Sequence, residues 1–392
     1  MATALLLLIY LAFISLGLPD SLLGSGWPAI HLDFEVSVSS LGIITMVISG
    51  CTILSSLFAD FLTRKLGTGT VTVASVFLTV LGLFGFSFST QFWMLVCWAL
   101  PYGLGAGAID ASLNNYVASH YKSRHMSWLH CFWGVGTIAS PFIMGYSLAH
   151  STWRNGFRIV GFAQLCIAAL LLACLPLWRK SGGAIEETRL DKKKGGVLEV
   201  LKTPGVLFLF LGFFAYCAAE ATSMQWASTY FVEVKGIGKE QAASFASLFY
   251  IGITLGRFLF GFFSEKLGDG KCIALGGAVA FLSLLFLALP TPSYWCAVVS
   301  FVGIGFGFGP IYPCLIHATP AHYGKQKSGS IIGMQMACAY VGSTFMPLLF
   351  GLLGKGVGFF IMPFYLLFFF ALMALFVLLC FRKAKQIPAP SK

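Results

Sequence analysis

Apolar runs long enough to cross a lipid bilayer recur twelve times along this chain of 392 residues. A spanning helix needs about 20 apolar residues. Runs of that length lie at roughly 4–27, 41–63, 70–90, 92–117, 128–149, 159–178, 205–232, 242–263, 272–289, 295–317, 329–353 and 357–381. The composition agrees, because 58% of the residues are hydrophobic and only 10% are charged. The sequence therefore predicts an all-α membrane protein with twelve transmembrane helices.

The two halves of the chain carry the same landmarks at nearly one displacement. Glu265 follows Asp60 by 205 residues. Pro347 and Gly351 follow Pro141 and Gly145 by 206 residues, and Lys325 and Lys327 follow Lys122 and Arg124 by 203 residues. A parallel duplication of six spans accounts for this regularity. We expect two six-helix bundles, at 1–178 and 205–392, joined by a polar cytoplasmic linker at 179–204.

Positive charge gathers in the loops that this topology places on one side of the membrane. The predicted inside loops contain Arg64, Lys65, Lys122, Arg124, Arg179, Lys180, Lys192 to Lys194, Lys266, Lys271, Lys325, Lys327, Arg382, Lys383 and Lys385, whereas the outside carries Arg154, Arg158, Lys235, Lys239 and Lys355. The positive-inside rule then predicts a protein of the cell (plasma) membrane with both termini cytoplasmic. The same rule explains the net charge of +11 without a nucleic-acid partner.

Other classes of protein find little support in the sequence. The 11 cysteines are scattered through apolar runs and include no CxxC pair, so we expect neither a disulfide framework nor a metal site. The N-terminal run lacks a basic segment and continues past Asp20 to Trp27, which favours a first span over a cleaved signal peptide. No Walker loop, kinase loop or nucleophile elbow is present. We therefore expect no enzyme and no cofactor, and active transport would use an ion gradient.

The fourth span combines close packing with polarity. Gly103 and Gly107 are four residues apart, a spacing that lets helices approach closely. Asp110 and Asn114 are also four apart and so share a face of the helix. A carboxylate within a span costs several kcal/mol unless it meets a partner or a wet cavity. We expect one face of this helix to pack on a neighbour and another to face a polar cavity.

Three acidic residues lie well inside spans, namely Asp20, Asp110 and Glu220. Each could serve as a hydrogen-bonded packing group, but three insertion costs on different helices favour a functional role. Such carboxylates can bind and release protons, which is what proton coupling requires. His130 in the fifth span is a further candidate for proton coupling, with a packing role as the open alternative.

Polar and aromatic side chains inside the spans are suited to a polar, uncharged substrate. The candidate binding residues are Asn114, Asn115, Trp133, Gln225, Trp226, Tyr230, Tyr312, Gln335 and Tyr340. Arg257 is the one basic residue set inside a predicted span, near its cytoplasmic end. Because no lysine or arginine lies deeper, the sequence disfavours a strongly anionic substrate.

The acid-bearing, basic-rich loops after spans two and eight resemble the signature of the major facilitator superfamily. The second copy keeps Gly261, the acid and Gly268, whereas the first has Ser56 for glycine and Phe61 where a basic residue is usual. The resemblance implies a conformational latch that forms in one state of the transport cycle. Its candidate residues are Asp60, Arg64, Arg257, Glu265 and Lys266.

A narrower resemblance, to the fucose permease (FHS) branch of sugar–proton symporters, rests on four spans. Its elements are Asp20, Asp110-x-x-x-Asn114, the Leu-His-x-Phe-x-Gly-x-Gly run around His130, and Glu220 followed by Gln225-Trp226. The resemblance implies that Asp20 and Asp110 serve sugar binding and proton coupling. Aspartate stands here where that branch has glutamate in span four, so the substrate can differ from fucose.

Three functions are consistent with these features. The first is a secondary transporter that works by alternating access, with proton-coupled uptake of a neutral sugar or related small polar solute. The second is a drug/proton antiporter that exports lipophilic cations. The third is a membrane receptor or scaffold that binds its ligand without moving it. We favour the first, and we expect a monomer whose partners are the substrate, protons and lipid.

Overall fold

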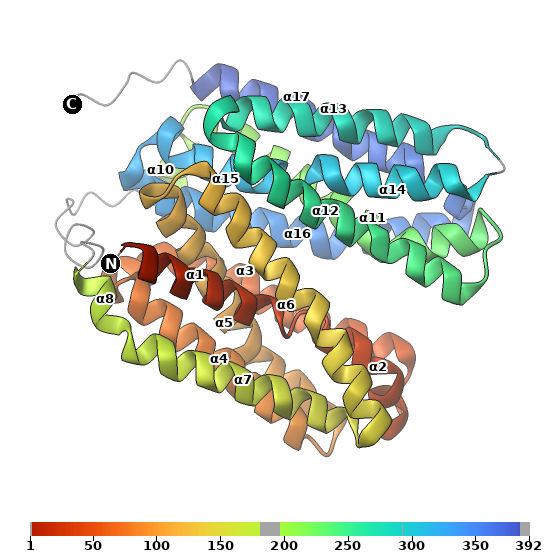
Figure 1. Cartoon of the computed structure of the whole chain (residues 1–392), viewed down its shortest axis with the longest axis horizontal. Coiled ribbons are helices and arrows are strands. Elements are labelled where there is room, and N and C mark those ends of the chain that lie inside the picture. Colours follow the sequence, from red (N-terminus) through yellow and green to blue (C-terminus); the bar gives the residue numbers. More distant parts are fainter. Residues whose placement is uncertain (1, 181–196, 292, 385–392) are drawn as a thin grey trace. The chain divides into compact units, whose positions relative to one another are not determined.

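The computed structural model describes residues 2–180, 197–291 and 293–384, and the regular structure in these ranges is helical throughout (Figure 1). Eleven stretches of the described residues are long and apolar enough to cross a membrane. The helix predicted as the fifth span is absent from the eleven, because histidine, serine and glycine dilute its apolar residues. The 28-residue helix itself is present.

The helices are distributed as the sequence predicted, with short additions. The first half contains α1 (Ala2–Gly17), α2 (Leu22–Asp33), α3 (Leu41–Leu66), α4 (Thr68–Phe88), α5 (Phe92–His120), α6 (Ser123–His150), α7 (Trp153–Ala173) and α8 (Leu175–Lys180). The second contains α10 (Val197–Leu201), α11 (Val206–Glu233), α12 (Lys239–Leu267), α13 (Asp269–Ala288), α14 (Tyr294–Phe308), α15 (Ile311–Tyr323), α16 (Lys325–Val357) and α17 (Met362–Ala384). Single 3₁₀ turns, η1 (Val38–Ser40) and η2 (Phe359–Ile361), precede α3 and α17.

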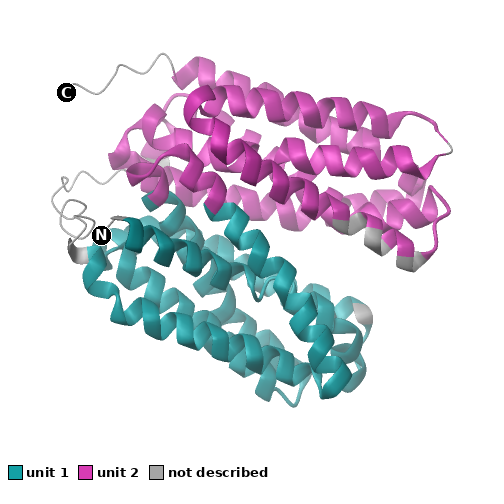
Figure 2. Cartoon of the chain, in the orientation of Figure 1, with its two compact units in different colours: residues 1–116, 129–194 teal, residues 117–128, 195–392 magenta. Residues whose placement is uncertain are grey.

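The chain divides into two compact units, coloured separately in Figure 2. Unit 1 comprises residues 1–116 and 129–194, and unit 2 comprises residues 117–128 and 195–392. In unit 1, α4 packs along α7; in unit 2, α11 packs on α16 and α17, and α14 on α12 and α13. The unexpected part is residues 117–128, which belong to unit 2 although their neighbours in sequence belong to unit 1. Of the predicted linker, residues 181–196 lie outside the described part of the chain.

The first span is broken into α1 and α2 by a turn at residues 18–21. Pro19 has no N–H, so it cannot donate the helical hydrogen bond to the carbonyl of Ser15. The structure satisfies that carbonyl from elsewhere, because the side-chain amide of Gln164 on α7 donates to it. Thr79 of α4 in turn donates to Gln164 Oε1 at 2.7 Å. The break therefore carries its own hydrogen-bond replacement, and it places Asp20 on a turn rather than on a helix.

The tenth span is also broken, between α14 and α15, at Gly309 and Pro310. The carbonyl of Phe308 accepts a hydrogen bond from the hydroxyl of Tyr216 on α11 at 3.0 Å. A Cβ added at Gly309 would overlap the backbone of α12 at Gly256 and Arg257. Gly309 therefore allows the backbone between α14 and α15 to contact the backbone of α12 next to Arg257.

Candidate functional site

The fourth predicted span, α5, is wedged between two neighbours by its glycines. A Cβ at Gly103 or Gly107 would overlap backbone carbonyls of α3, and one at Gly105 would overlap a carbonyl of α4. The side chain of Thr52 on α3 donates to the Gly103 carbonyl at 3.1 Å. The prediction of a close-packing glycine face is confirmed. The remaining surface of α5 carries Asp110 and Asn114, which are buried, and the half-buried Asn115.

A second glycine contact joins α1 to α6 next to Asp20. A Cβ at Gly17 would overlap the carbonyl of Trp133, and one at Gly136 would overlap the carbonyl of Ile14. Two facing glycines therefore let the end of α1 lie directly on α6. This approach fixes the position of the turn that follows α1, and with it the position of Asp20 relative to Trp133.

Asp20 accepts two hydrogen bonds from aromatic side chains of unit 1. The indole N–H of Trp133 on α6 donates to Oδ2 at 2.8 Å, and the hydroxyl of Tyr102 on α5 donates to Oδ1 at 3.2 Å. As a whole residue Asp20 is exposed, while Tyr102 is buried. Ionisable side chains within a span almost always face the interior of a helix bundle or a water-filled cavity. The carboxylate, the indole and the phenol thus form one polar cluster.

Asp110, Asn114 and His130 form a second, buried cluster in unit 1. Asn114 Nδ2 donates to Asp110 Oδ1 at 2.8 Å, and Asn114 Oδ1 lies 3.0 Å from His130 Nε2. Because the amide nitrogen already donates to the aspartate, the amide oxygen must accept from His130 Nε2–H. The ring of Phe13 meets the imidazole edge-on, with centroids 5.4 Å apart. An amide thus links a carboxylate to an imidazole inside the membrane region.

In unit 2 the third intramembrane acid is neutralised by an arginine. Arg257 Nη2 of α12 lies 3.0 Å from Glu220 Oε1 of α11, and the two side chains are only 4% and 12% exposed. Both residues are predicted site residues, Glu220 for proton coupling and Arg257 for the latch. The structure brings them together as a buried ion pair.

Trp226 and its neighbours on α11 differ in their surroundings. The indole of Trp226 donates to the carbonyl of Pro347 at 2.8 Å and stacks on Phe359 with centroids 5.3 Å apart. These contacts give Trp226 a packing role against α16 and η2. Tyr230 is buried, whereas Gln225 is exposed.

The other predicted binding residues of unit 2 lie on α15 and α16. The hydroxyl of Tyr312 lies 3.2 Å from the sulfur of Met336, and Thr319 donates to Gln335 Oε1 at 3.3 Å. Gln335 is fully buried and Tyr340 is half-buried. The position of Gln335 and Tyr340 in the sequence does not reveal this difference in burial.

The two predicted latch acids have different partners. Asp60 pairs with Arg64 one turn along α3, at 3.0 Å. Glu265 at the end of α12 instead pairs with Lys122 at 3.1 Å and with Arg124 at 2.9 Å. These two basic residues belong to the segment 117–128, which lies in unit 2. Lys266, the fifth latch candidate, is exposed.

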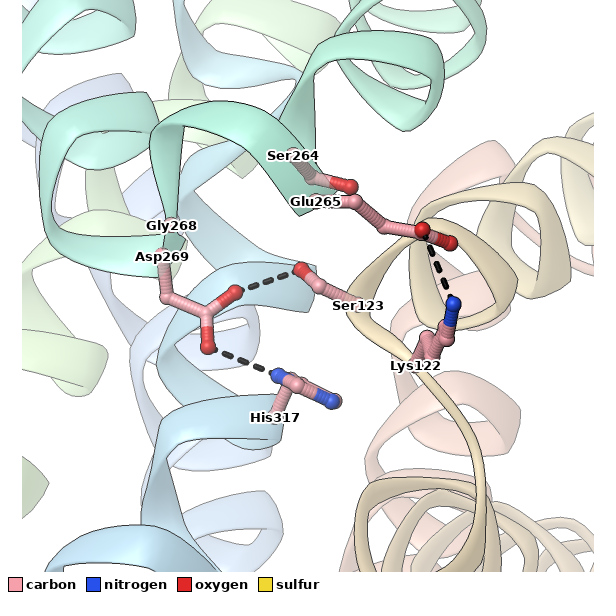
Figure 3. A pocket seen from close by; sticks show the side chains of 7 residues that line it. All are labelled: Lys122, Ser123, Ser264, Glu265, Gly268, Asp269 and His317. Carbon is pink, nitrogen blue, oxygen red and sulfur yellow. Dashed lines mark hydrogen bonds and ion pairs between the residues drawn. The ribbon is translucent and has the colours of Figure 1, made fainter.

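A pocket of about 360 Å³ adjoins this ion pair (Figure 3). Its lining residues are Lys122, Ser123, Ser264, Glu265, Gly268, Asp269 and His317. Figure 3 shows the Asp269 carboxylate between Ser123 and His317. Sequence reasoning missed Tyr102, Ser123, Asp269 and His317. The available signal for Asp269 was a second acid directly after Gly268, four residues beyond Glu265.

A model of the Major Facilitator Superfamily matches residues 9–347. The chain belongs to the Major Facilitator Superfamily. It is therefore a secondary transporter and an integral membrane protein rather than an enzyme, and the predicted fold class is confirmed.

Relatives and solved structures of the superfamily resemble the chain over most of its length. Bypass of stop codon protein 6 of Saccharomyces cerevisiae is 24% identical over 382 residues, covering 88% of this chain and 76% of that protein. The E. coli fucose:proton symporter FucP has a TM-score of 0.77 at 16% identity, covering 96% and 98%. The proton:xylose symporter XylE has a TM-score of 0.81 at 13% identity, covering 97% and 95%. At these identities the structural matches show the fold alone.

Proposed function

We propose that this transporter takes up a neutral sugar or related small polar solute together with protons. The observation that carries the proposal is the carboxylate of Asp20, which accepts hydrogen bonds from Trp133 and Tyr102 within the first span. A carboxylate has about four lone-pair sites, so two hydrogen bonds leave room for the hydroxyl groups of a sugar. The indole beside it offers an apolar face for the C–H surface of the ring.

The buried Asp110–Asn114–His130 cluster supports the proton-coupling part of the proposal. Carboxylate and histidine chains inside transporters serve as proton relays. Asn114 contacts both the carboxylate of Asp110 and the imidazole of His130. A proton taken up at Asp110 therefore changes the hydrogen bond between Asn114 and His130. We assign the coupling role to this cluster in unit 1. Glu220, already neutralised by Arg257, has a supporting role in unit 2.

Two further properties belong to the same proposal. The basic residues of the loops support an orientation with both termini in the cytoplasm at the plasma membrane. The site residues of each unit come from that unit's own helices, which supports a monomer as the working form.

The first experiment identifies the ligand. Purified protein is screened by thermal shift against neutral sugars, polyols and lipophilic cations at low and neutral pH. A ligand at about one hundred times its Kd should stabilise the fold by about 2.7 kcal/mol. A pH-dependent sugar hit supports the symporter. Stabilisation by a lipophilic cation, with no stabilisation by any sugar, favours the drug/proton antiporter. Ligand binding without counterflow transport favours a receptor.

The second experiment assigns the carboxylates in proteoliposomes with an imposed proton gradient. Asp110→Asn should abolish gradient-driven accumulation while substrate exchange without a gradient continues. Asp20→Asn should raise the apparent Kd about tenfold or more, because it weakens charge-assisted hydrogen bonds. Glu35→Gln, an exposed acid of the same half, is the matched control. Unchanged gradient-driven accumulation in Asp110→Asn would remove the coupling assignment.

A further inference from the structure

Residues 117–128, here called the strap, join the two helices that carry most of the candidate site. The strap comprises the last turn of α5, the turn at Tyr121 and Lys122, and the first turns of α6. Asp110 and Asn114 lie on α5, and His130 and Trp133 lie on α6. Yet the strap itself packs with unit 2 (Figure 2). The strap is therefore continuous, through α5 and α6, with the helices that carry the site in unit 1.

Two groups of polar contacts link the strap to the rest of unit 2, in addition to the packing of Trp128 on Phe262 of α12 with ring centroids 5.4 Å apart. The first is the ion pair of Glu265 with Lys122 and Arg124, which belongs to the proposed latch. The second is formed by Asp269 at the start of α13 and by His317 on α15. The hydroxyl of Ser123 donates to Asp269 Oδ1, and His317 Nε2 lies 3.1 Å from the carbonyl oxygen of Tyr121. The imidazole thus contacts the strap backbone directly.

Both ring nitrogens of His317 are within hydrogen-bond distance of an oxygen. Nδ1 lies 2.7 Å from Asp269 Oδ2, and Nε2 lies 3.1 Å from a backbone carbonyl. A carbonyl oxygen can only accept, so Nε2 must carry a hydrogen. The contact between Nδ1 and the carboxylate needs a second hydrogen between them. The pair therefore holds two protons in this arrangement, as an imidazolium beside a carboxylate.

We propose that His317 and Asp269 form a cytoplasmic proton-binding site whose occupancy holds the strap on unit 2. Loss of one proton leaves a neutral imidazole with a single N–H. It then serves either the carboxylate or the Tyr121 carbonyl, and the other contact is lost. The docked strap binds one more proton than the released strap, so rising pH favours release. This inference goes beyond the proposed substrate, since it holds for any molecule that the transporter carries.

Other charged and titratable groups surround the pair of His317 and Asp269. The charged or titratable side chains that the structure describes on the strap and on the helices around the ring are His120, Tyr121, Lys122, Arg124 and His125 on the strap; Tyr216, Cys217, Glu220, Tyr230 and Glu233 on α11; Tyr250, Arg257, Glu265 and Lys266 on α12; Asp269, Lys271 and Cys272 on α13; Tyr294 and Cys296 on α14; Tyr312, Cys314, His322 and Tyr323 on α15; and Lys325, Lys327, Cys338, Tyr340 and Lys355 on α16. Among the described side chains, Asp269 is the acid that contacts the imidazole. Glu265 is engaged by Lys122 and Arg124. Burial and then the charge of Arg124 lower the pKa of His125.

Hydrogen–deuterium exchange of the full-length protein in lipid nanodiscs tests the proposal between pH 5.5 and 8.5. After correction for intrinsic rates, exchange in peptides covering 117–128 should rise about tenfold with pH, the effect of losing one charge-assisted hydrogen bond. His317→Gln should exchange fast at every pH. His317→Arg, which keeps its donors charged throughout, should exchange slowly at every pH.

Two histidine variants serve as matched controls. His322→Gln changes a histidine of the same helix that packs on Phe381, and His125→Gln changes the histidine of the strap. Both should retain the wild-type pH dependence. A flat wild-type profile overturns the proposal, as does a transition of unchanged size in His317→Gln or one that disappears in His125→Gln. If His317→Gln fails to fold, the pH dependence of exchange in the wild-type protein and in His317→Arg still tests the proposal.

Discussion

Single side chains inside the membrane region of this transporter have defined hydrogen-bond partners. The sequence identified the acids Asp20, Asp110 and Glu220 because charge inside an apolar run stands out. It could not identify Tyr102 as a partner of Asp20, because a phenol in an apolar run resembles ordinary core or belt packing. It also assigned Arg257 to the latch, from its place near the predicted cytoplasmic end of its span. The contact with Glu220 depends on how α11 and α12 pack, which a linear pattern does not contain.

The buried pair of Glu220 and Arg257 leads to a stability prediction. Breaking a buried ion pair at one side leaves an uncompensated charge and costs about 3–5 kcal/mol, whereas apolar replacement of both partners is often neutral. Glu220→Gln and Arg257→Met should each lower the thermal melting temperature in detergent. The double variant should melt closer to the wild-type protein than either single variant. Additive losses in the double variant would show that the two groups are not coupled.

At the scale of elements, breaks and glycine contacts determine where the site residues lie. The apolar runs predicted the positions of the helices well, because a spanning run must be about 20 residues long. They did not predict that the first span divides into α1 and α2. Pro19 is visible in the sequence, but a proline in a span can also produce a simple kink. The side chain that accommodates this break, Gln164, is 149 residues away.

The contact of α1 with α6 leads to a prediction about glycine. Gly136→Ala should displace Trp133 from Asp20, because a Cβ there would overlap the backbone of α1. Gly145→Ala on the same helix is the matched control, since a Cβ there meets nothing within 4 Å. We expect Gly136→Ala to lower both the melting temperature and the affinity for substrate. Gly145→Ala should be neutral or stabilise by up to about 1 kcal/mol. Equal behaviour of the two variants would contradict the role of this contact.

At the scale of the whole molecule, the two halves of the predicted repeat differ at corresponding positions. The sequence predicts this repeat from landmarks separated by nearly constant distances. The membership of residues 117–128 in unit 2 was not predictable, because compactness depends on contacts rather than on sequence order. The difference shows at the two signature acids. Asp60 is paired within its own helix, while Glu265 holds the strap.

This asymmetry predicts unequal effects of equivalent substitutions. Glu265→Gln should accelerate hydrogen exchange in peptides covering 117–128 by a fewfold at low salt, with a smaller effect at high salt, because exposed ion pairs are weak and screened. Asp60→Asn is the equivalent change in the other half. It should leave exchange in that segment at the wild-type rate. Equal acceleration by both variants would show that the two copies still act alike.

The break in the first span also has an evolutionary consequence. Pro19 withholds a hydrogen bond from the Ser15 carbonyl, and Gln164 supplies the replacement. A change at either position alone therefore carries a penalty that a change at both can relieve. Among descendants of a common ancestor, these two positions should vary together although they lie in the first and sixth spans. A lineage that lost the glutamine would be expected to lose the proline as well, and to inherit an unbroken first helix.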